Sequence, residues 1–370
     1  MRVSRGGGWA VVAVLAAAAA ALAWASPAAA RDGGRSSLPL RFFGVAPQTP
    51  LGPADFGRMR GAVGTLRIPF NWSELEPKPG THDFDRLDAE VLAAAAHRMT
   101  VLPVVYGTPA WLAPDPARPP LASARARRAW ASFLRTLVRR YGPRGSVWEG
   151  ARRREPIHSW QIWNEPNFRL FWRPHPAPRL YARLLSISRS ALRRADRRAR
   201  IVGAGVAPVS AGIAPWHFLR RLYRVPGVKR SLDVVALHPY AARVSLMKME
   251  VRAVRTVLDR AGARRTPLLI SELGVASWGS VPSAFVRGRA GQASFLRRAY
   301  GWLVKRRRSL RIAGVYWFTW RDVDRLDRHC AFCQGAGLID RRGRSKPAWR
   351  AYRRMVAQAR RKAARGRLSR

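Results

Sequence analysis

Two glutamates stand where their carboxylates could act together on one bond. Of the eight glutamates in the chain, Glu165 and Glu272 each come at the end of a short apolar run. One carboxyl group that donates a proton and a second that attacks carbon are what the cleavage of a glycosidic bond requires. The pair predicts retention of configuration if the carboxyl groups lie about 5–5.5 Å apart, and inversion if they lie about 6.5–9.5 Å apart.

Further polar and aromatic side chains follow other apolar runs in the same way. A barrel of parallel strands would bring the ends of these runs to one face, where its loops form a site. Polar groups at so many run ends are hard to explain by packing, so we expect a substrate site lined by aromatic rings. Its candidate members beside the two glutamates are Arg67, Trp111, Asn164, His238, Tyr240, Trp317 and Trp320.

Eight apolar runs alternate with amphipathic segments between residues 38 and 352. The runs are apolar on successive residues, as strands buried on both faces must be. They are Arg41–Ala46, Gly64–Ile68, Thr100–Val105, His158–Trp163, Arg200–Val206, Leu232–Leu237, Leu268–Ser271 and Ile312–Trp317. Helical stripes lie between them, at 130–141 and at Asp85–Arg98, Arg179–Ala195, Leu246–Ala261, Gln292–Arg306 and Pro347–Arg361.

This rhythm predicts an α/β fold, a (β/α)8 TIM barrel that forms a single catalytic domain over residues 38–352. An open doubly wound sheet is the alternative. It is disfavoured because no glycine-rich phosphate loop follows the first strand, so a dinucleotide cofactor is not expected. We expect no cofactor of any kind.

The stretch from Trp160 to Asn167, which contains Asn164-Glu165-Pro166, resembles the acid/base strand of the retaining barrel glycosidases of clan A. It is most similar to glycoside hydrolase family 39, which includes β-xylosidases, and next to family 5. The resemblance extends over nearly the whole chain after residue 38. One departure is Tyr106, which ends the third strand where many family 5 members have a histidine.

The resemblance implies a role for each candidate. Glu165 would be the acid/base and Glu272 the nucleophile, while Asn164 would bond the 2-hydroxyl group of the sugar. Arg67 would keep the nucleophile ionised, and Tyr240, paired with His238, would donate a hydrogen bond to it. Trp317 would form an aromatic floor under the sugar. Trp111 and Trp320 have two alternative roles, as walls of the cleft or as residues of the hydrophobic packing.

The two ends of the chain and its two cysteines bear on location. Residues 1–30 have basic residues, a long uncharged stretch and an Ala-x-Ala pattern, and are expected to be a signal peptide, with an uncleaved anchor as the alternative. Residues 31–37 would be a linker and residues 353–370 a basic tail. We expect a secreted or cell-surface protein in which Cys330 and Cys333 form a disulfide, with no metal site.

The net charge of +48 is the most unusual number in the composition. It is consistent with an anionic cell-wall polymer as a partner and equally with a genome-wide excess of arginine codons, and no specific nucleic acid is expected. Arg169, Arg173 and Arg321 follow predicted strand ends, which suggests an acidic substrate, or simply solvated side chains. We expect a monomeric glycosidase of polysaccharides or oligosaccharides; the alternative is a non-hydrolytic glycan- or polyanion-binding barrel.

Overall fold

The computed structural model describes residues 38–209, 211–324, 330 and 332–365. The predicted signal peptide at 1–30 and the linker at 31–37 lie outside the described residues. The predicted basic tail is described only in its first part, where α10 (Pro347–Arg365) continues to Arg365 as one helix.

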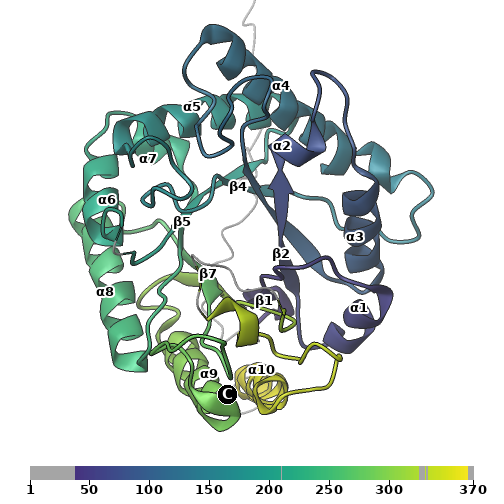
Figure 1. The fold of residues 1–370 in the computed structure, drawn as a ribbon, viewed down its shortest axis with the longest axis vertical. Coiled ribbons are helices and arrows are strands. Elements are labelled where there is room, and N and C mark those ends of the chain that lie inside the picture. The colour runs from purple at the N-terminus through teal and green to yellow at the C-terminus, as the bar shows by residue number, and fades with distance from the viewer. Residues whose placement is uncertain (1–37, 210, 325–329, 331, 366–370) are drawn as a thin grey trace, which may run out of the picture.

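Eight parallel strands close into a barrel in which each strand pairs with its neighbours in sequence and β1 pairs with β8 (Figure 1). The strands are β1 (Phe43–Val45), β2 (Thr65–Asn71), β3 (Thr100–Tyr106), β4 (Ser159–Ile162), β5 (Arg200–Val206), β6 (Val234–Leu237), β7 (Leu268–Leu273) and β8 (Ile312–Trp317). The prediction of a single-domain (β/α)8 barrel is confirmed.

Helices surround the barrel on its outside (Figure 1). Before α10 the chain forms α1 (Pro53–Met59), α2 (Trp72–Leu75), α3 (Asp85–Ala96), α4 (Ala124–Tyr141), α5 (Pro178–Ala195), α6 (Pro215–Tyr223), α7 (Val228–Ser231), α8 (Val244–Arg260) and α9 (Gly288–Arg306). Three short 3-10 helices add η1 (Leu40–Phe42), η2 (Ser146–Trp148) and η3 (Cys333–Gly335). Within the described part of the chain, no helix is long and apolar enough to cross a membrane.

The apolar stripe of α4 shows how sequence becomes packing. Trp130, Phe133, Leu134 and Leu137 recur at helical spacing, and all four are at most 1% exposed. The helix begins where the Ser123 hydroxyl accepts a hydrogen bond from the backbone N–H of Ala126, at 3.0 Å. Such a cap satisfies a backbone donor that the first turn leaves free, and the stripe then holds the helix against the strands.

The second strand continues past its predicted end. It runs from Thr65 to Asn71 and pairs residue by residue with β3, although Pro69 lies within it. A proline removes only one backbone donor, and the paired residues on either side of Pro69 maintain the strand. The strand therefore delivers Asn71 and the following α2 to the rim of the barrel.

Candidate active site

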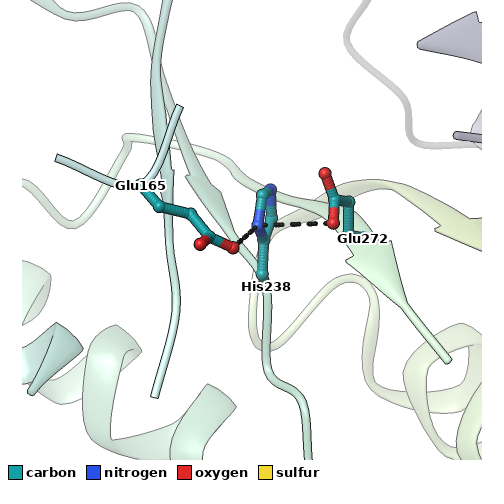
Figure 2. A group of neighbouring side chains, drawn as sticks. All are labelled: Glu165, His238 and Glu272. Carbon is teal, nitrogen blue, oxygen red and sulfur yellow. Dashed lines mark hydrogen bonds and ion pairs between the residues drawn. The ribbon is translucent and has the colours of Figure 1, made fainter. Parts of the chain in front are cut away.

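Glu165 and Glu272 face one another at the carboxyl ends of their strands. Glu165 follows β4, Glu272 belongs to β7, and both are buried. Figure 2 shows the two carboxylates pointing toward His238, which lies between them. One oxygen of each carboxylate and one ring nitrogen of His238 all lie within 4.8 Å of one another.

Arg67 binds the nucleophile candidate and the strand that carries the acid candidate. Its Nη1 forms a short ion pair with Oε1 of Glu272, and both groups are buried. Its Nε donates to Oε1 of Gln161 at 2.9 Å, and its Nη2 donates to Oδ1 of Asn164 at 2.7 Å. A planar guanidinium with donors in fixed directions can satisfy three acceptors at once, which orients β2, β4 and β7 relative to one another.

Tyr240 and His238, from the end of β6, complete the contacts of the two carboxylates. The hydroxyl of Tyr240 donates to Oε2 of Glu272 at 2.5 Å. Nδ1 of His238 lies 2.7 Å from Oε1 of Glu165 and 3.7 Å from Oε2 of Glu272. Nε2 of His238 is buried and has no hydrogen-bond partner among the residues that the structure describes.

The surroundings shift the pKa values of the two glutamates in opposite directions. Burial raises the pKa of Glu165, although its hydrogen bond to His238 partly offsets this effect. Burial alone would also raise the pKa of Glu272, but the charges of His238 and Arg67, with the hydrogen bond from Tyr240, outweigh it, so that the pKa lies below its ordinary value. The site therefore favours a protonated Glu165 beside an ionised Glu272.

Tyr240 remains a hydrogen-bond donor in this environment. Burial, followed by the negative charge of Glu272, raises the pKa of the Tyr240 hydroxyl well above its ordinary value. A phenol that keeps its proton can donate to a carboxylate at every pH at which the enzyme would work. The contact consequently stabilises the ionised form of Glu272.

The backbone at the end of β4 adopts a conformation that side chains rarely tolerate. Trp163 has a φ of 68° and Glu165 a φ of 39°, both in the left-handed region. Such geometry costs of order 1–3 kcal/mol per residue and persists only where the surrounding structure enforces it. Buried Asn167 supplies part of that enforcement, because its amide bonds the backbone of Ala207 and Ile213 in the neighbouring loop.

Two residues of the site were not among the candidates from the sequence. Gln161 is fully buried, accepts from Arg67 and donates to the Trp163 carbonyl at 3.3 Å. The signal for it was a glutamine between the apolar residues Trp160 and Ile162, two positions before Trp163. Tyr106 lies near the site at the end of β3. Burial and the negative charges of Glu74 and Glu272 raise the pKa of its hydroxyl, and the charge of Arg67 only partly offsets this effect.

The three tryptophan candidates differ in burial and in their partners. Trp317 is fully buried and its Nε1 donates to the Ala336 carbonyl at 3.0 Å. Trp111 is partly exposed, and its Nε1 donates to the Glu76 carbonyl at 2.9 Å. Trp320 is 1% exposed and packs edge-on against Trp349 of α10, with ring centres 5.0 Å apart. The structure thus packs Trp320 against α10, the second of the two readings that the sequence left open.

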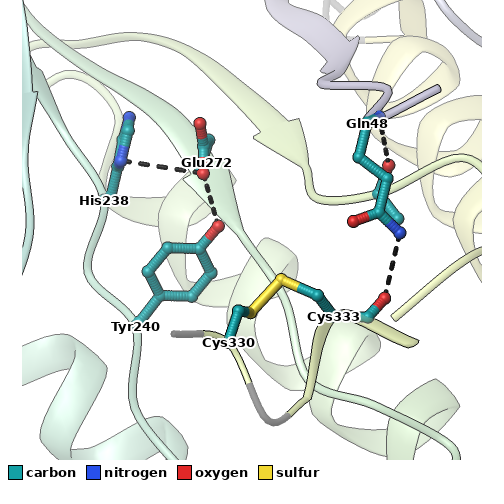
Figure 3. Close-up of a disulfide and its surroundings, with 7 residues drawn as sticks. Gln48, His238, Tyr240, Glu272, Cys330 and Cys333 are labelled. Atoms are coloured by element: carbon teal, nitrogen blue, oxygen red, sulfur yellow. Dashed lines mark hydrogen bonds and ion pairs between the residues drawn. A yellow bond between two sulfur atoms is a disulfide. The ribbon is translucent and has the colours of Figure 1, made fainter. Parts of the chain in front are cut away.

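Cys330 and Cys333 are joined by a disulfide in the loop after β8, close to Tyr240 and Glu272 (Figure 3). Gln48 binds this loop through a hydrogen bond from its Nε2 to the Cys333 carbonyl at 3.0 Å. Phe332, between the cysteines, lies 5.2 Å from the ring of Tyr240. The loop therefore packs on the residue that contacts the nucleophile candidate.

The grouping of Glu165, His238 and Glu272 has a spacing that could also hold a metal ion. Arg67, however, already places a permanent positive charge against Glu272. A second cation at this point would be repelled by it, so the donor set suits proton transfer better than metal binding.

Two of the three arginines expected to bind an acidic substrate interact within the chain. Arg321 donates to Asp55 at 2.6 Å, and Arg173 lies 3.8 Å from a carboxylate oxygen of Asp115. Arg169 is exposed. These three side chains give little support for recognition of an acidic sugar at the cleavage point.

No model of a protein family matches the chain, and no curated protein sequence matches it. Among solved structures, it is similar to a family 39 glycoside hydrolase from Bacteroides cellulosilyticus WH2, with 19% identity and a TM-score of 0.64 over 86% of this chain and 64% of that one. GH5_18 from Streptomyces cattleya, in complex with GlcNAc, has 19% identity and a TM-score of 0.65 over 88% and 81%. A monomeric beta-xylosidase from Caulobacter crescentus CB15 has 18% identity and a TM-score of 0.63 over 87% and 69%.

The chain thus spans just under two thirds of the Bacteroides enzyme and somewhat more of the other two. At such identities a structural likeness establishes the fold. These structure neighbours include members of both families that the sequence motifs resemble. The chain accordingly has the closed (β/α)8 barrel fold that glycoside hydrolases of families 39 and 5 share.

Proposed function

We propose that the protein is a retaining glycoside hydrolase that cleaves a polysaccharide or oligosaccharide by double displacement. The observation that carries this proposal is the pair of buried carboxylates whose facing oxygens lie within 4.8 Å of each other. That separation suits direct attack by one carboxylate, whereas an inverting enzyme needs about 6.5–9.5 Å to place a water molecule between carboxylate and sugar. The barrel fold shared with glycosidases supports the same conclusion.

In the first step, an oxygen of Glu272 attacks the anomeric carbon while Glu165 gives its proton to the departing glycosidic oxygen. The carbon–oxygen bond to the leaving group breaks and an ester bond to Glu272 forms. The lowered pKa of Glu272 keeps the attacking group ionised, and the raised pKa of Glu165 keeps the acid protonated.

In the second step, Glu165 takes a proton from water, which attacks the anomeric carbon and releases Glu272. Formation of the ester has removed the negative charge of Glu272, one of the influences that raises the pKa of Glu165. The pKa of Glu165 therefore falls once the ester has formed. Glu165 then stays ionised and can act as the base that activates water. Two displacements at the same carbon restore its original configuration.

Asn164 is oriented for contact with the sugar. Its Oδ1 accepts from Nη2 of Arg67, which assigns the oxygen to Arg67 and leaves the amide N–H groups to donate. The side chain is partly exposed beside Glu165. A donor at this point can bond a sugar hydroxyl next to the anomeric carbon, where such bonds strengthen in the transition state.

The test is a screen of aryl glycosides and polysaccharides in which NMR follows the anomeric configuration of the first product. We expect the product to retain the configuration of the substrate. Glu272→Ala should lose turnover on every substrate, whereas Glu149→Ala, an exposed glutamate away from the site, should not. Inversion of configuration, or unchanged turnover of Glu272→Ala, would contradict the proposal.

We also infer that the protein is exported. The pattern of residues 1–30 supports a signal peptide, and a disulfide between Cys330 and Cys333 suits an oxidising compartment. N-terminal sequencing of the protein recovered outside the cell should begin shortly after residue 30. Recovery only from the cytoplasm would contradict the inference.

A further inference from the structure

A groove of about 720 Å³ lies between the first parts of α8 and α9, and its charged lining is entirely basic. The two helices follow one another round the outside of the barrel (Figure 1). The cations that line the groove are Arg243, Lys248, Arg252, Arg287 and Arg298, with no acidic side chain among the lining residues.

These five cations form no ion pair with any carboxylate in the described ranges. Arginines elsewhere do, as Arg140 does with Asp88. In the groove, Nζ of Lys248 and the guanidinium of Arg252 lie instead 5.9 Å and 5.5 Å from the ring centre of Trp302. An aromatic face positions a cation without neutralising it, so the charge stays available to a ligand.

Two arginines of the groove follow closely in the sequence after residues at or next to the candidate active site. Arg243 is the N-cap of α8 and follows closely after Tyr240, whose hydroxyl donates to the nucleophile. Arg287 is the N-cap of α9 and follows closely after Phe285. The ring of Phe285 stacks on Phe332 at 4.9 Å, and Phe332 lies 5.2 Å from the ring of Tyr240. Partly exposed aromatic rings thus lead from the candidate nucleophile to Phe285, two residues before Arg287 of the groove.

We propose that this groove binds the carboxylate or sulfate groups of an acidic polysaccharide whose chain extends from the catalytic carboxylates. Cleavage of this polysaccharide rests on the proposed function, whereas its binding to the groove does not. Arginine donates paired hydrogen bonds to carboxylate and sulfate oxygens, and a polymer offers such groups at regular intervals. Each exposed contact is weak, whereas several contacts along one chain add up.

A flat anionic membrane is the competing partner, because Leu246 and Met249 on α8 are 43% and 57% exposed. The observations favour the polysaccharide for two reasons. The cations line a concave groove, and the aromatic rings that lead from Phe285 to the candidate nucleophile suit sugar faces.

The test measures binding in a Glu272→Ala background, so that no substrate is consumed. The probes are polygalacturonate with its neutral methyl ester, and dextran sulfate with neutral dextran, titrated by calorimetry. The groove variant is R243Q/R287Q/R298Q, all exposed side chains. The matched control is R128Q/R135Q/R194Q, which removes the same number of charges from a groove between α4 and α5.

We expect at least one charged glycan to bind more tightly than its neutral counterpart. The groove variant should bind it about tenfold more weakly, and the control variant should lose less than about threefold. The difference should shrink as salt rises from 50 to 300 mM, because exposed charges are screened. Equal losses in both variants, or no preference for charged glycans, would overturn the proposal and assign any binding to overall charge.

Vesicles of phosphatidylglycerol and phosphatidylcholine distinguish the membrane. If the groove variant loses binding to these vesicles but keeps its affinity for both charged glycans, the proposal is wrong and the groove serves a lipid surface. The outcome is separable from that of the proposed function. Turnover by Glu272→Ala would overturn the double displacement, while the binding measured here would stand or fall by the groove variants alone.

Discussion

Glu165 and Glu272 are the same side chain in two environments, and the environments shift their pKa values in opposite directions, as the proposed acid and nucleophile require. Both are buried, which by itself favours the neutral carboxyl. Glu272 is held ionised by Arg67 and Tyr240, whereas Glu165 has only the imidazole of His238 as a close partner. The distribution of partners, rather than the residue type, assigns the roles.

Under the proposed mechanism, removal of the Glu165 carboxyl group should affect the two displacement steps differently. In Glu165→Ala, a glycoside with an acidic leaving group needs no proton for its departure, so its first step should survive. The second step loses its base, and turnover should fall at least about a hundredfold. Azide needs no base, so added azide should restore turnover and give a glycosyl azide with the configuration of the substrate, as read by NMR.

Glu272→Ala provides the control for this experiment. Without a nucleophile, azide can only displace the leaving group directly, so any azide product should have the opposite configuration. Azide that gives no glycosyl azide with Glu165→Ala would show that the role assigned to Glu165 is wrong.

Loss of the Arg67 cation should move the pH profile of kcat/KM. Its charge lowers the pKa of Glu272, and with Arg67→Met that pKa should rise. Fewer molecules then hold an ionised nucleophile at low pH, so the acidic limb of the profile should move upward by about one pH unit. Arg67→Lys keeps the charge and should move this limb less, even if kcat falls. An unmoved acidic limb in Arg67→Met would contradict this account of the nucleophile.

At the scale of elements, the ends of the strands decide where each side chain points. The left-handed backbone at Trp163 and Glu165 turns the chain at the end of β4, and Asn167 anchors the following loop. On the outer ring, α8 carries a different kind of buried carboxyl. Glu250 is 9% exposed, and its Oε2 has no hydrogen-bond partner among the residues described.

Glu250 should make the stability of the protein depend on pH. Burial raises its pKa from 4.5 to about 7. Because the folded state holds this proton more tightly than the unfolded state, the free energy of unfolding should fall as pH rises from 4.5 to about 7 and then level off. Glu250→Gln removes this cost, so at pH 8 it should be more stable than the wild type by about 1 kcal/mol, allowing for solvent screening.

Thermal or urea unfolding at several pH values measures this effect. The two proteins should be nearly equally stable below about pH 4, where the wild-type carboxyl is mostly protonated in both the folded and the unfolded state. Glu149→Gln, on an exposed turn, is the matched control, and its difference in stability from the wild type should not grow with pH in this way. A constant difference between Glu250→Gln and wild type at all pH values would rule out titration of Glu250 as the cause.

At the scale of the whole molecule, the excess of positive charge is the dominant electrostatic feature. Lys+Arg number 69 against 21 for Asp+Glu, so most cations cannot find a carboxylate within the chain. Several acids that are described form ion pairs, such as Asp322 with Lys346 in the interior and Asp55 with Arg321. The remaining cations repel one another across the surface.

Salt should therefore stabilise the folded protein. Screening of like charges over a Debye length of about 3 Å at 1 M, against about 30 Å at 0.01 M, relieves repulsion in the compact state. Between 0.01 and 0.5 M sodium chloride we expect a gain of about 1–2 kcal/mol, a rise in Tm of about 2–5 °C. The measurement uses chloride and not sulfate, because sulfate also stabilises proteins by its exclusion from their surface. A Tm that falls with salt would contradict this view.

The sequence by itself determined the barrel and the two carboxylates. Runs such as Val101–Val105 and Ile312–Trp317 are apolar on successive residues, as strands buried on both faces must be, and their regular alternation with helical stripes allows few other architectures. A glutamate within two residues of the end of such a run is expected at the rim of a parallel barrel. Glu165 and Glu272 could for that reason be placed in one site without coordinates.

Only the tertiary structure decided which neighbours complete the site. Trp317 and Trp320 follow one another at the end of β8 and both are buried, but their ring contacts are with different helices. Trp317 lies 6.4 Å from Tyr300 of α9 and Trp320 lies 5.0 Å from Trp349 of α10, which the spacing of the two residues does not reveal. Gln161 became a partner of Arg67 through the register of β2, β3 and β4. The opposite pKa shifts of Glu165 and Glu272 likewise arise from burial and from charges on other strands, which a linear sequence does not contain.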